Sequence, residues 1–463
     1  METVFRWSAF GIFVVALIGA FQCFGLDFFK SAFGIRLITD PSIWGNLENV
    51  NFAMEANTSY TTLYNPNYLS FYFGMLIPLA VCMFIAAKKQ FLLRIVLAML
   101  ILLSVICMKG SHSDSGWVAL VAAVCIVTII LLSRKKKALF IGIGVIAAGF
   151  AAFIAVCALT PIGTKISAVV VGTYHMEETF ALRSMETTAD HVILDIRGNK
   201  VFLSYENGEA DGERSLVYTD ENGIALAKTR LDETNKIDCL DDPTYAGCQI
   251  QQTVLDDMPG IRVNLEDKTW DFVYIAENGY YYANAFGNLV QPGPIEHVSL
   301  FRENAMSGRG HIWNNTIPLL KKYVFAGAGA NAFMLVYPQD DYIYRVYTSE
   351  ENSFDVKAHC WYLQQWVENG LIGLLLLIGF LGWYVVRSAR IYRRADLKER
   401  ISWIGIGLFT AVLVSMIVAL VNDSNVATAP VFWAILGLGM AVNRIIAEKE
   451  GLFQTKDSIL VKK

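Results

Sequence analysis

Charged residues are scarce in this chain, and with them the features that mark soluble enzymes or nucleic-acid-binding proteins. Asp, Glu, Lys and Arg make up 17% of the 463 residues, whereas hydrophobic residues make up 54% and the mean hydropathy is +0.42. The net charge of −4 gives no reason to expect a nucleic-acid partner. The composition is too apolar for a soluble enzyme and is typical of a polytopic membrane protein.

Several familiar motifs are also missing. No small-x-small cleavage site follows the first apolar run before Asp27, so we interpret that run as a retained anchor and not as a signal peptide. The glycine-rich AGAGANAF is not followed by Gly-Lys-Ser/Thr, which excludes a P-loop. No charged residue lies deep inside an apolar run and no internal repeat is visible, which argues against a transporter.

What the chain does have is a series of long apolar runs. A helix needs about 20 mostly apolar residues to cross a bilayer. About eight runs qualify: 8–26, 68–87, 91–108, 116–133, 138–160, 370–386, 401–421 and 429–447. The sequence therefore predicts a mainly α-helical polytopic membrane protein with about eight transmembrane helices.

The basic residues between these runs predict the orientation. With a cytoplasmic N-terminus, the inner segments hold the basic clusters at 134–137 and 387–400, whereas the short outer loops carry only Lys30, Arg36 and Lys109. We expect a multi-pass protein of the inner or plasma membrane with both termini in the cytoplasm. The predicted parts are a five-span half at 1–160, outer segments at 176–298 and 299–369, a three-span half at 370–447 and a cytoplasmic tail at 448–463.

The outer segment at 176–298 reads as an inserted β-rich domain. Its alternating runs are separated by Arg-Gly-Asn-Lys at 197–200 and by Glu-Asn-Gly at 206–208, 221–223 and 277–279. Such turns supply the positive φ angles that hairpins need. Cys239 and Cys248 suggest a local disulfide in an oxidising compartment, with two free thiols as the alternative. The acids at 241–242 and 256–257 fit no calcium loop.

The segment 307–373 joins this insert to an apolar run. SGRGHIWNNT predicts a helix capped by Ser307, with Trp313 on an apolar face, Asn314 toward water or headgroups and a kink at Pro318. Arg309 in its first turn suits a diphosphate, or else a lipid phosphate. The glycines of AGAGANAF permit a tight turn. Four tyrosines then lie at positions that suit sugar stacking or a headgroup belt: 337, 342, 344 and 347.

A continuous helix is expected from Ala358 into the run at 370–386. It would place His359, Leu363, Trp366 and Gly370 on one face, with His359 outside the membrane. A lone histidine is more often structural than catalytic, but here it shares an outer segment with an arginine and a glycine turn.

Two shorter motifs precede membrane spans. The Asn65-Pro66-Asn67 motif lies before the run at 68–87 and is either an interfacial turn or part of a site. The loop KGSHSDSG holds Lys109 and His112. Its Ser, His and Asp are too close in sequence to form a catalytic triad, and solvation explains them.

Together these motifs resemble the C-terminal signature of the O-antigen ligase and polysaccharide polymerase superfamily. The matching pieces are Ser307-Gly308-Arg309, Trp313, Gly327-Ala328-Gly329, His359 and Glu368-Asn369-Gly370-Leu371-Ile372-Gly373. The Asn65-Pro66-Asn67 motif also looks like the family's earlier signature. The resemblance covers the membrane part of about 300 residues and excludes the β-rich insert.

The resemblance implies a membrane glycosyltransferase that moves an oligo- or polysaccharide from polyprenyl diphosphate to the hydroxyl of a saccharide or lipid-linked acceptor. Arg309 and His359 match the family's essential arginine and histidine, and no metal or other cofactor is implied. The candidate substrate-binding residues are Arg302, Trp313, Gly327, Gly329, Asn65, Asn67, Lys109 and His112.

Three departures from the family pattern keep two alternatives open. Cys360 stands where the family usually has Asn, KGSHSDSG stands where it usually has Ser-Arg, and the predicted spans are fewer than usual. The alternatives are a truncated inactive member of the family and a non-catalytic membrane protein whose β-rich insert binds glycan or a partner enzyme.

Overall fold

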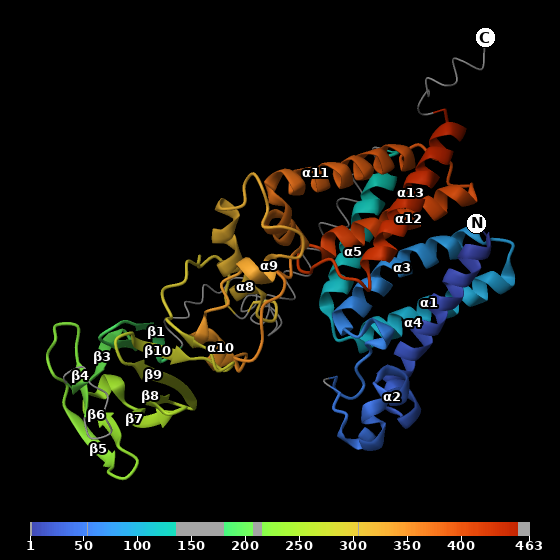
Figure 1. Cartoon of the computed structure of the whole chain (residues 1–463). Coiled ribbons are helices and arrows are strands. Elements are labelled where there is room, and N and C mark those ends of the chain that lie inside the picture. The colour runs from blue at the N-terminus through green and yellow to red at the C-terminus, as the bar shows by residue number, and fades with distance from the viewer. Residues whose placement is uncertain (1, 53, 136–179, 207–214, 304, 452–463) are drawn as a thin grey trace, which may run out of the picture. The chain divides into compact units, whose positions relative to one another are not determined.

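A computed structural model describes residues 2–52, 54–135, 180–206, 215–303 and 305–451. The chain divides into two compact units, and each is described by itself. The helical unit comprises Met1–Leu159, Cys360–Tyr362 and Gly373–Lys463. The β-containing unit comprises Thr160–His359 and Leu363–Ile372. Figure 1 labels the elements of both.

The helical unit is built from long apolar helices. They are α1 (Glu2–Cys23), α3 (Pro66–Ala86), α4 (Phe91–Gly110), α5 (Asp114–Leu132), the part of α11 (Trp361–Tyr392) from Gly373 onward, α12 (Arg400–Val418) and α13 (Ala429–Lys449). Between α1 and α3 the chain forms η1 (Phe28–Lys30), α2 (Ala32–Ile38), η2 (Pro41–Asn49) and η3 (Thr61–Leu63).

Helices α3 and α12 form the centre of the helical unit. Phe73 on α3 and Phe409 and Val412 on α12 are fully buried and belong to one hydrophobic cluster. One polar group of this interior is paired twice: Asn443 accepts a 2.6 Å hydrogen bond from the Tyr392 hydroxyl and donates one of 2.8 Å to Ser388 Oγ. An unpaired polar group would cost free energy at such a depth.

Six of the described helices are long and apolar enough to cross a membrane: α3, α4, α5, α11, α12 and α13. Their outer surfaces carry apolar side chains, such as Leu102 at 60% exposure and Leu376 at 70%, as expected for contact with lipid. The predicted first span corresponds to α1, whose described apolar portion is the shorter run Ala9–Cys23. The predicted span at 138–160 lies outside the described residues.

The β-containing unit holds two antiparallel sheets. The first sheet contains β1 (Leu182–Thr187), β2 (Val192–Ile196), β3 (Asn199–Tyr205) and β4 (Leu216–Thr219), in that order. The second runs from β11 (Leu289–Val290) through β10 (Gly279–Ala283), β9 (Lys268–Ile275), β8 (Met258–Leu265), β7 (Cys248–Leu255) and β6 (Ile237–Leu240) to β5 (Lys228–Asp232). A short helix, η6 (Pro243–Tyr245), links β6 to β7.

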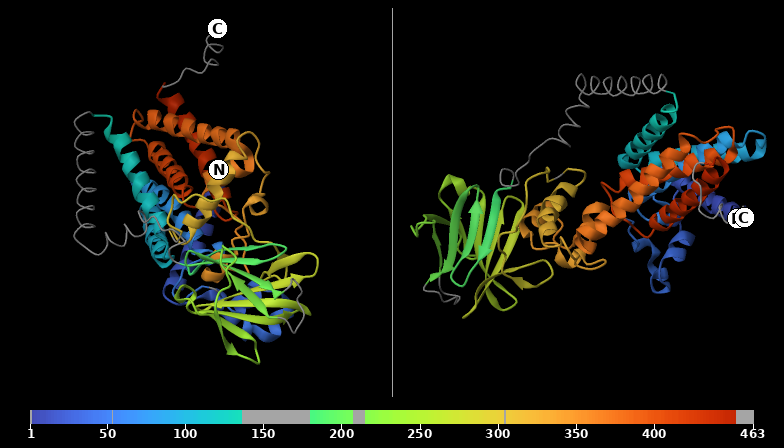
Figure 2. Two further views of the ribbon diagram at one scale, coloured as in Figure 1. Left: turned by 90° about the vertical axis from the view of Figure 1, so that its left-hand side faces the viewer. Right: turned by 90° about the horizontal axis from the view of Figure 1, so that it is seen from above.

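One core lies between the two sheets. Strands such as β2 and β3 alternate buried and half-buried positions, as expected for strands with one covered face. Leu194 and Val201 of the first sheet share a cluster with Trp270 of the second. The Tyr205 hydroxyl donates a 3.0 Å hydrogen bond to the Gly260 carbonyl across this core. Figure 2 shows the sheets as separate layers.

Two of the expected turns form hairpins, whereas Glu-Asn-Gly at 221–223 lies between β4 and β5, which belong to different sheets. Arg197 and Gly198 have φ values of 52° and 90° between β2 and β3, and Glu277 and Gly279 have 69° and 92° between β9 and β10. Register is regular through β9 and β10, with Tyr280 opposite Tyr274 and Tyr282 opposite Phe272. The Glu-Asn-Gly at 206–208 extends beyond the described residues.

A helix from outside the predicted insert completes the β core. Helix α10 (Tyr342–Thr348) contributes Ile343 and Val346 to the cluster between the sheets. Tyr347 of the same helix stacks on Phe180 at 4.0 Å, and its hydroxyl accepts a 3.1 Å hydrogen bond from Leu182 N. The compact unit therefore continues past residue 298, and the predicted division at 298/299 separates elements that share one core.

The rest of the β-containing unit is a set of short helices. They are α8 (Arg309–Thr316), η7 (Ile317–Lys321) and α9 (Phe333–Val336). A further cluster, including Ile312, Phe333 and Val367, joins these helices to the first turns of α11.

Candidate functional site

Arg309 opens helix α8, but not in the way the sequence predicted. Ser307 has a φ of 62° and does not cap the helix, because Gly308, at φ 83°, occupies the cap position. The Arg309 side chain is half-buried, and its Nη1 donates a 3.1 Å hydrogen bond to the Met306 carbonyl. The Ser-Gly-Arg sequence thus forms a left-handed turn that leads directly into the helix.

Helix α8 is buried and does not have the polar outer face expected of an interfacial helix. Every residue from Gly310 to Thr316 is buried. Asn314, predicted to face water or headgroups, instead accepts hydrogen bonds from Leu300 N and Phe301 N and donates one of 2.7 Å to the Phe301 carbonyl. The helix changes to the 3-10 form of η7 next to Pro318, in line with the predicted kink.

Trp313 connects α8 to the segment that carries His359. Its indole Nε1 donates a 2.9 Å hydrogen bond to the Ala358 carbonyl, and the side chain is 7% exposed. Arg309 lies one turn before Trp313 on the same helix face. The bond therefore holds the residue next to His359 against the face that also carries Arg309. The buried indole is thus part of the packing of this unit, and the substrate-binding role of Trp313 stays a prediction.

His359 does not begin a helix, contrary to the sequence prediction. It is half-buried, has a φ of 47° and precedes α11, which starts at Trp361. Gly370 interrupts that helix with φ 74° and ψ 171°. The predicted single face through His359, Leu363, Trp366 and Gly370 is therefore wrong, because both of its ends lie outside regular helix.

The two glycine motifs pack against each other. Ala328 N and Gly329 N donate hydrogen bonds of 2.8 Å and 3.0 Å to the carbonyls of Val367 and Glu368. A Cβ on Gly327 would lie 2.0 Å from the Glu368 carbonyl oxygen. Gly327 and Gly329, predicted as substrate-binding residues, thus have a packing explanation, since the Gly-x-Gly turn sits on the Glu-Asn-Gly break in α11.

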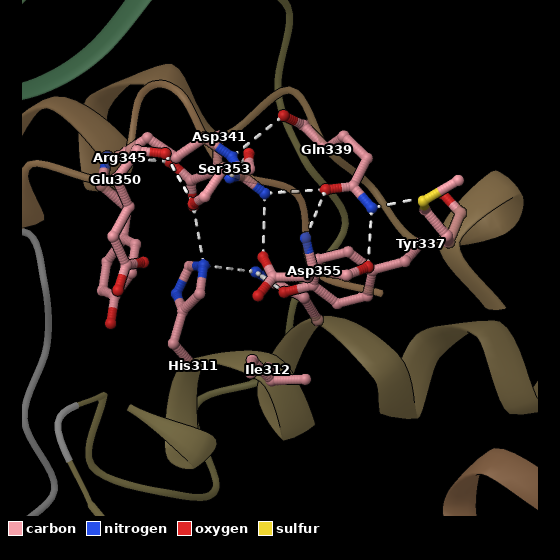
Figure 3. A network of polar contacts seen from close by, with 12 residues as sticks. His311, Ile312, Tyr337, Gln339, Asp341, Arg345, Glu350, Ser353 and Asp355 are labelled. Carbon is pink, nitrogen blue, oxygen red and sulfur yellow. Dashed lines mark hydrogen bonds and ion pairs between the residues drawn. The ribbon is translucent and has the colours of Figure 1, made fainter. Parts of the chain in front are cut away.

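His311 is a buried titratable residue that sequence reasoning missed. Its Nδ1 lies 2.6 Å from Glu303 Oε2, and its Nε2 lies 3.0 Å from Asn315 Nδ2 and 3.6 Å from Asp341 Oδ2. The ring stacks on Tyr344 with centroids 3.5 Å apart (Figure 3 shows part of this network). Burial raises the pKa of Asp341, although His311 and the Tyr344 N–H oppose that rise. Asn315 lies one helical turn away, but Asp341 is thirty residues further along the chain, so the network as a whole could not be predicted from the sequence.

Arg345 is the hub of a second buried network. It is 5% exposed, and it donates to the Gln339 carbonyl, the Ser353 carbonyl and Asp355 Oδ2 at 3.1, 2.6 and 2.8 Å. Figure 3 shows these bonds tying the chain on either side of α10 together. Tyr337 and Tyr344 nearby are buried, so for them neither a headgroup belt nor sugar stacking holds.

The remaining predicted site residues have simpler surroundings. Asn65 caps α3 through a 2.8 Å hydrogen bond from Asn67 N to its Oδ1, and the role of this motif in a site stays a prediction. Lys109 and His112 are exposed at the end of α4. All four belong to the helical unit, whereas Arg302, Arg309 and His359 belong to the β-containing unit. Arg302 is half-buried in the segment that leads into α8.

Cys239 and Cys248 are free thiols, so the expected disulfide is absent. Strands β6 and β7 pair Cys239 with Gln249, which leaves Cys248 one position away in register. Neighbouring strand positions point to opposite faces. Cys248 faces the buried core with Leu240, whereas Cys239 faces the other side, so the two sulfur atoms do not meet.

At least three cavities are bordered by described residues of a single unit. The β-containing unit has one of about 230 Å³, bordered by Arg183, Glu186 and Asp341, and one of about 100 Å³ next to Arg345. The helical unit has one of about 50 Å³ beside Trp361 and Asp423. Among the described residues, those that line these cavities include neither Arg309 nor His359. No three His, Cys, Asp or Glu residues in the described ranges form a group able to hold a metal ion.

No known protein family, no curated protein and no solved structure gave a match to this chain.

Proposed function

We propose that this chain is a membrane glycosyltransferase of the O-antigen ligase or polysaccharide polymerase type. It would transfer an oligo- or polysaccharide from polyprenyl diphosphate to an acceptor hydroxyl. The signature motifs support the proposal, and the observation that carries it is the Trp313–Ala358 hydrogen bond. That bond draws together two motifs almost fifty residues apart in sequence, one with Arg309 and one with His359.

The proposed chemistry uses side chains alone. The acceptor oxygen attacks the anomeric carbon of the donor, and the bond between that carbon and the diphosphate oxygen breaks. Arg309 stabilises the charge that develops on the departing diphosphate, because a guanidinium can hold two of its oxygens at once. His359 aligns the acceptor hydroxyl and accepts its proton.

The backbone at His359 gives this assignment a second support. A non-glycine residue with positive φ costs of order 1–3 kcal/mol and persists only where the surrounding structure fixes it. His359 is held at φ 47° between the anchored Ala358 carbonyl and the start of α11. Arg197 and Glu277 also have positive φ, but they lie in hairpin turns, whereas His359 lies in no hairpin and is the residue predicted to be catalytic.

The transferase assay tests the function directly. Purified protein is given a polyprenyl-diphosphate-linked glycan and an acceptor glycan, and transfer is followed by mass change. Arg309→Ala should slow transfer by about 100- to 1,000-fold, and Arg309→Lys by less, since the lysine keeps charge but loses the paired donors. His359→Ala should lower turnover more than donor binding. Lys321→Ala, which removes an 81%-exposed cation from η7, is the matched control.

Unchanged transfer in all three site variants would reject the assignment of Arg309 and His359. The non-catalytic alternative would then replace the transferase proposal. The truncated-member alternative predicts instead that the wild-type chain transfers nothing while still binding the lipid-linked donor.

The proposal includes an orientation in the membrane. Six apolar helices are compatible with a multi-pass protein, and the basic loops favour cytoplasmic termini with 161–358 outside. Reporter fusions after residue 137 and within β8 should report opposite sides of the membrane. Fusions that report the same side would reject this orientation without bearing on the chemistry.

A further inference from the structure

The smaller cavity of the β-containing unit is walled by aromatic rings. We call it the aromatic cleft and define it by Tyr282, Phe286, Tyr342 and Phe354, which line a volume of about 100 Å³. Tyr282 and Tyr342 pack at 4.9 Å, and Phe286 and Phe354 stack at 4.8 Å with an interplanar angle of 8°. The two phenylalanines are 44% and 52% exposed. Large rings left this open need a reason, because burying them would stabilise the fold.

The turn that carries Phe286 is held in place by hydrogen bonds. Asn284 Oδ1 accepts a 3.0 Å bond from Phe286 N and a 2.9 Å bond from Asn288 N. The Asn284 amide also hydrogen-bonds the Tyr342 hydroxyl, which links this turn to α10. The ring of Phe286 therefore projects from a fixed backbone between β10 and β11.

The loop that carries Phe354 is held just as firmly from the other side. Arg345 donates to the Ser353 carbonyl at 2.6 Å and to Asp355 Oδ2 at 2.8 Å, so it binds both neighbours of Phe354 (Figure 3). Gln339 Oε1 accepts a 3.0 Å hydrogen bond from Asp355 N. A rigid exposed ring loses little conformational entropy on binding a ligand.

The polar groups of the cleft differ in availability. Arg345 and Gln339 are engaged by the network that positions the loop. The side chains of Asn288 and Glu351 also line the cleft, and neither forms a side-chain hydrogen bond or ion pair with any other described residue. The cleft thus presents flat apolar faces together with one amide and one carboxylate, while its arginine is neutralised by Asp355.

We propose that the aromatic cleft is a saccharide-binding site. Sugar rings have apolar faces that stack on aromatic rings and equatorial hydroxyls that hydrogen-bond amides and carboxylates. A small site with apolar walls and few polar groups suits such a ligand. The uncompensated charge of Glu351 favours neutral or amino sugars and disfavours uronic acids. Neither Arg309 nor His359 lines the cleft, and its ligand binding does not depend on the proposed transfer reaction.

A binding experiment on the full chain in detergent tests this site without turnover. Fluorescently labelled protein is applied to an array of neutral, amino-sugar and uronate-containing oligosaccharides, and affinities for the best ligands are measured by titration. Wild type should bind neutral or amino-sugar oligosaccharides. Phe286→Ala and Phe354→Ala should each weaken binding about 5- to 10-fold, whereas Phe286→Trp should keep it. Ile224→Ala, which trims a 63%-exposed apolar residue outside the cleft, should bind like wild type.

Thermal melting of each variant shows whether it is folded. We expect the alanine variants to fold, because the rings of Phe286 and Phe354 are exposed and the backbone hydrogen bonds around them do not involve the rings. Glu351→Gln should preserve binding of neutral sugars and improve binding of uronates. Absence of saccharide binding by wild type, or equal binding by folded alanine variants, would overturn the proposal. Preferential binding of uronates by wild type would overturn its charge assignment.

Discussion

The Trp313 indole N–H donates a 2.9 Å hydrogen bond to the Ala358 carbonyl, and this bond holds the backbone directly before His359. Trp313 is buried, so the donor has no water to replace its partner. The interaction relates two parts of the chain that are joined by η7, α9 and α10. It makes the backbone before α11 dependent on the position of α8.

Trp313→Phe is expected to separate packing from hydrogen bonding at this contact. Phenylalanine keeps most of the ring but leaves the buried Ala358 carbonyl without its donor, which costs about 1–3 kcal/mol. The β-containing unit should melt at a lower temperature, and transfer should fall with it. Trp366→Phe, which alters another indole of the same unit, is the control, and equal effects of both would show that the bond has no special role.

Gly327→Ala should disrupt the packing of the Gly-x-Gly turn. The added methyl would lie 2.0 Å from the Glu368 carbonyl oxygen, so either the turn or the first part of α11 must move. We expect destabilisation of about 1–3 kcal/mol, as for other overpacked sites. Gly293→Ala meets no atom within 4 Å and should be nearly neutral. Comparison of the two melting curves checks the assignment, which fails if Gly327→Ala is equally silent.

Arg345→Met should loosen the loop that carries Phe354. Removal of the guanidinium leaves the carboxylate of Asp355 and two backbone carbonyls without this donor. We expect a loss of stability of about 3–5 kcal/mol, as for other buried ion pairs that lose one partner. Hydrogen exchange of residues 349–356 should accelerate more than that of β8. Uniform exchange across the unit would mean that Arg345 supports the whole core and not this loop.

The buried carboxyl of Asp341 should make the stability of the fold depend on pH. Burial raises its pKa above the ordinary 3.8, and His311, Glu303 and Arg345 are the charged groups that face it. The folded chain then holds this proton more tightly than the unfolded chain. The contribution of Asp341 to stability is therefore greatest below pH 3.8 and declines as pH rises through the raised folded value.

Asp341→Asn tests this dependence while retaining the cap on α10, since an amide oxygen can still accept from Tyr344 N. The variant should melt higher than wild type above the titration window, and the difference should shrink on acidification. The control is Asp340→Asn, at an exposed neighbouring position. A difference between Asp341→Asn and wild type that is constant with pH would contradict the raised pKa.

Periodicity alone determined much of this architecture. In a bilayer, a run of about 20 apolar residues pairs its backbone hydrogen-bonding groups internally by forming a helix. Six of the predicted spans are described as long apolar helices. Alternation and Asn-Gly turns likewise located β2, β3, β9 and β10 within one or two residues. These features depend on neighbours in sequence, which is why they could be read without coordinates.

Only the tertiary structure decided the roles of individual polar side chains. His311 meets Asn315 on its own helix, but Glu303 and Asp341 come from two other segments, and no local pattern encodes that convergence. The same holds for Cys239 and Cys248: their closeness in sequence suggested a bond, yet strand register places them on opposite faces. Glycines 327 and 370 could be recognised as a motif from sequence. Only the fold shows that each glycine packs against the segment of the other. Two backbones must come close for this contact, and the sequence of either segment alone does not reveal it.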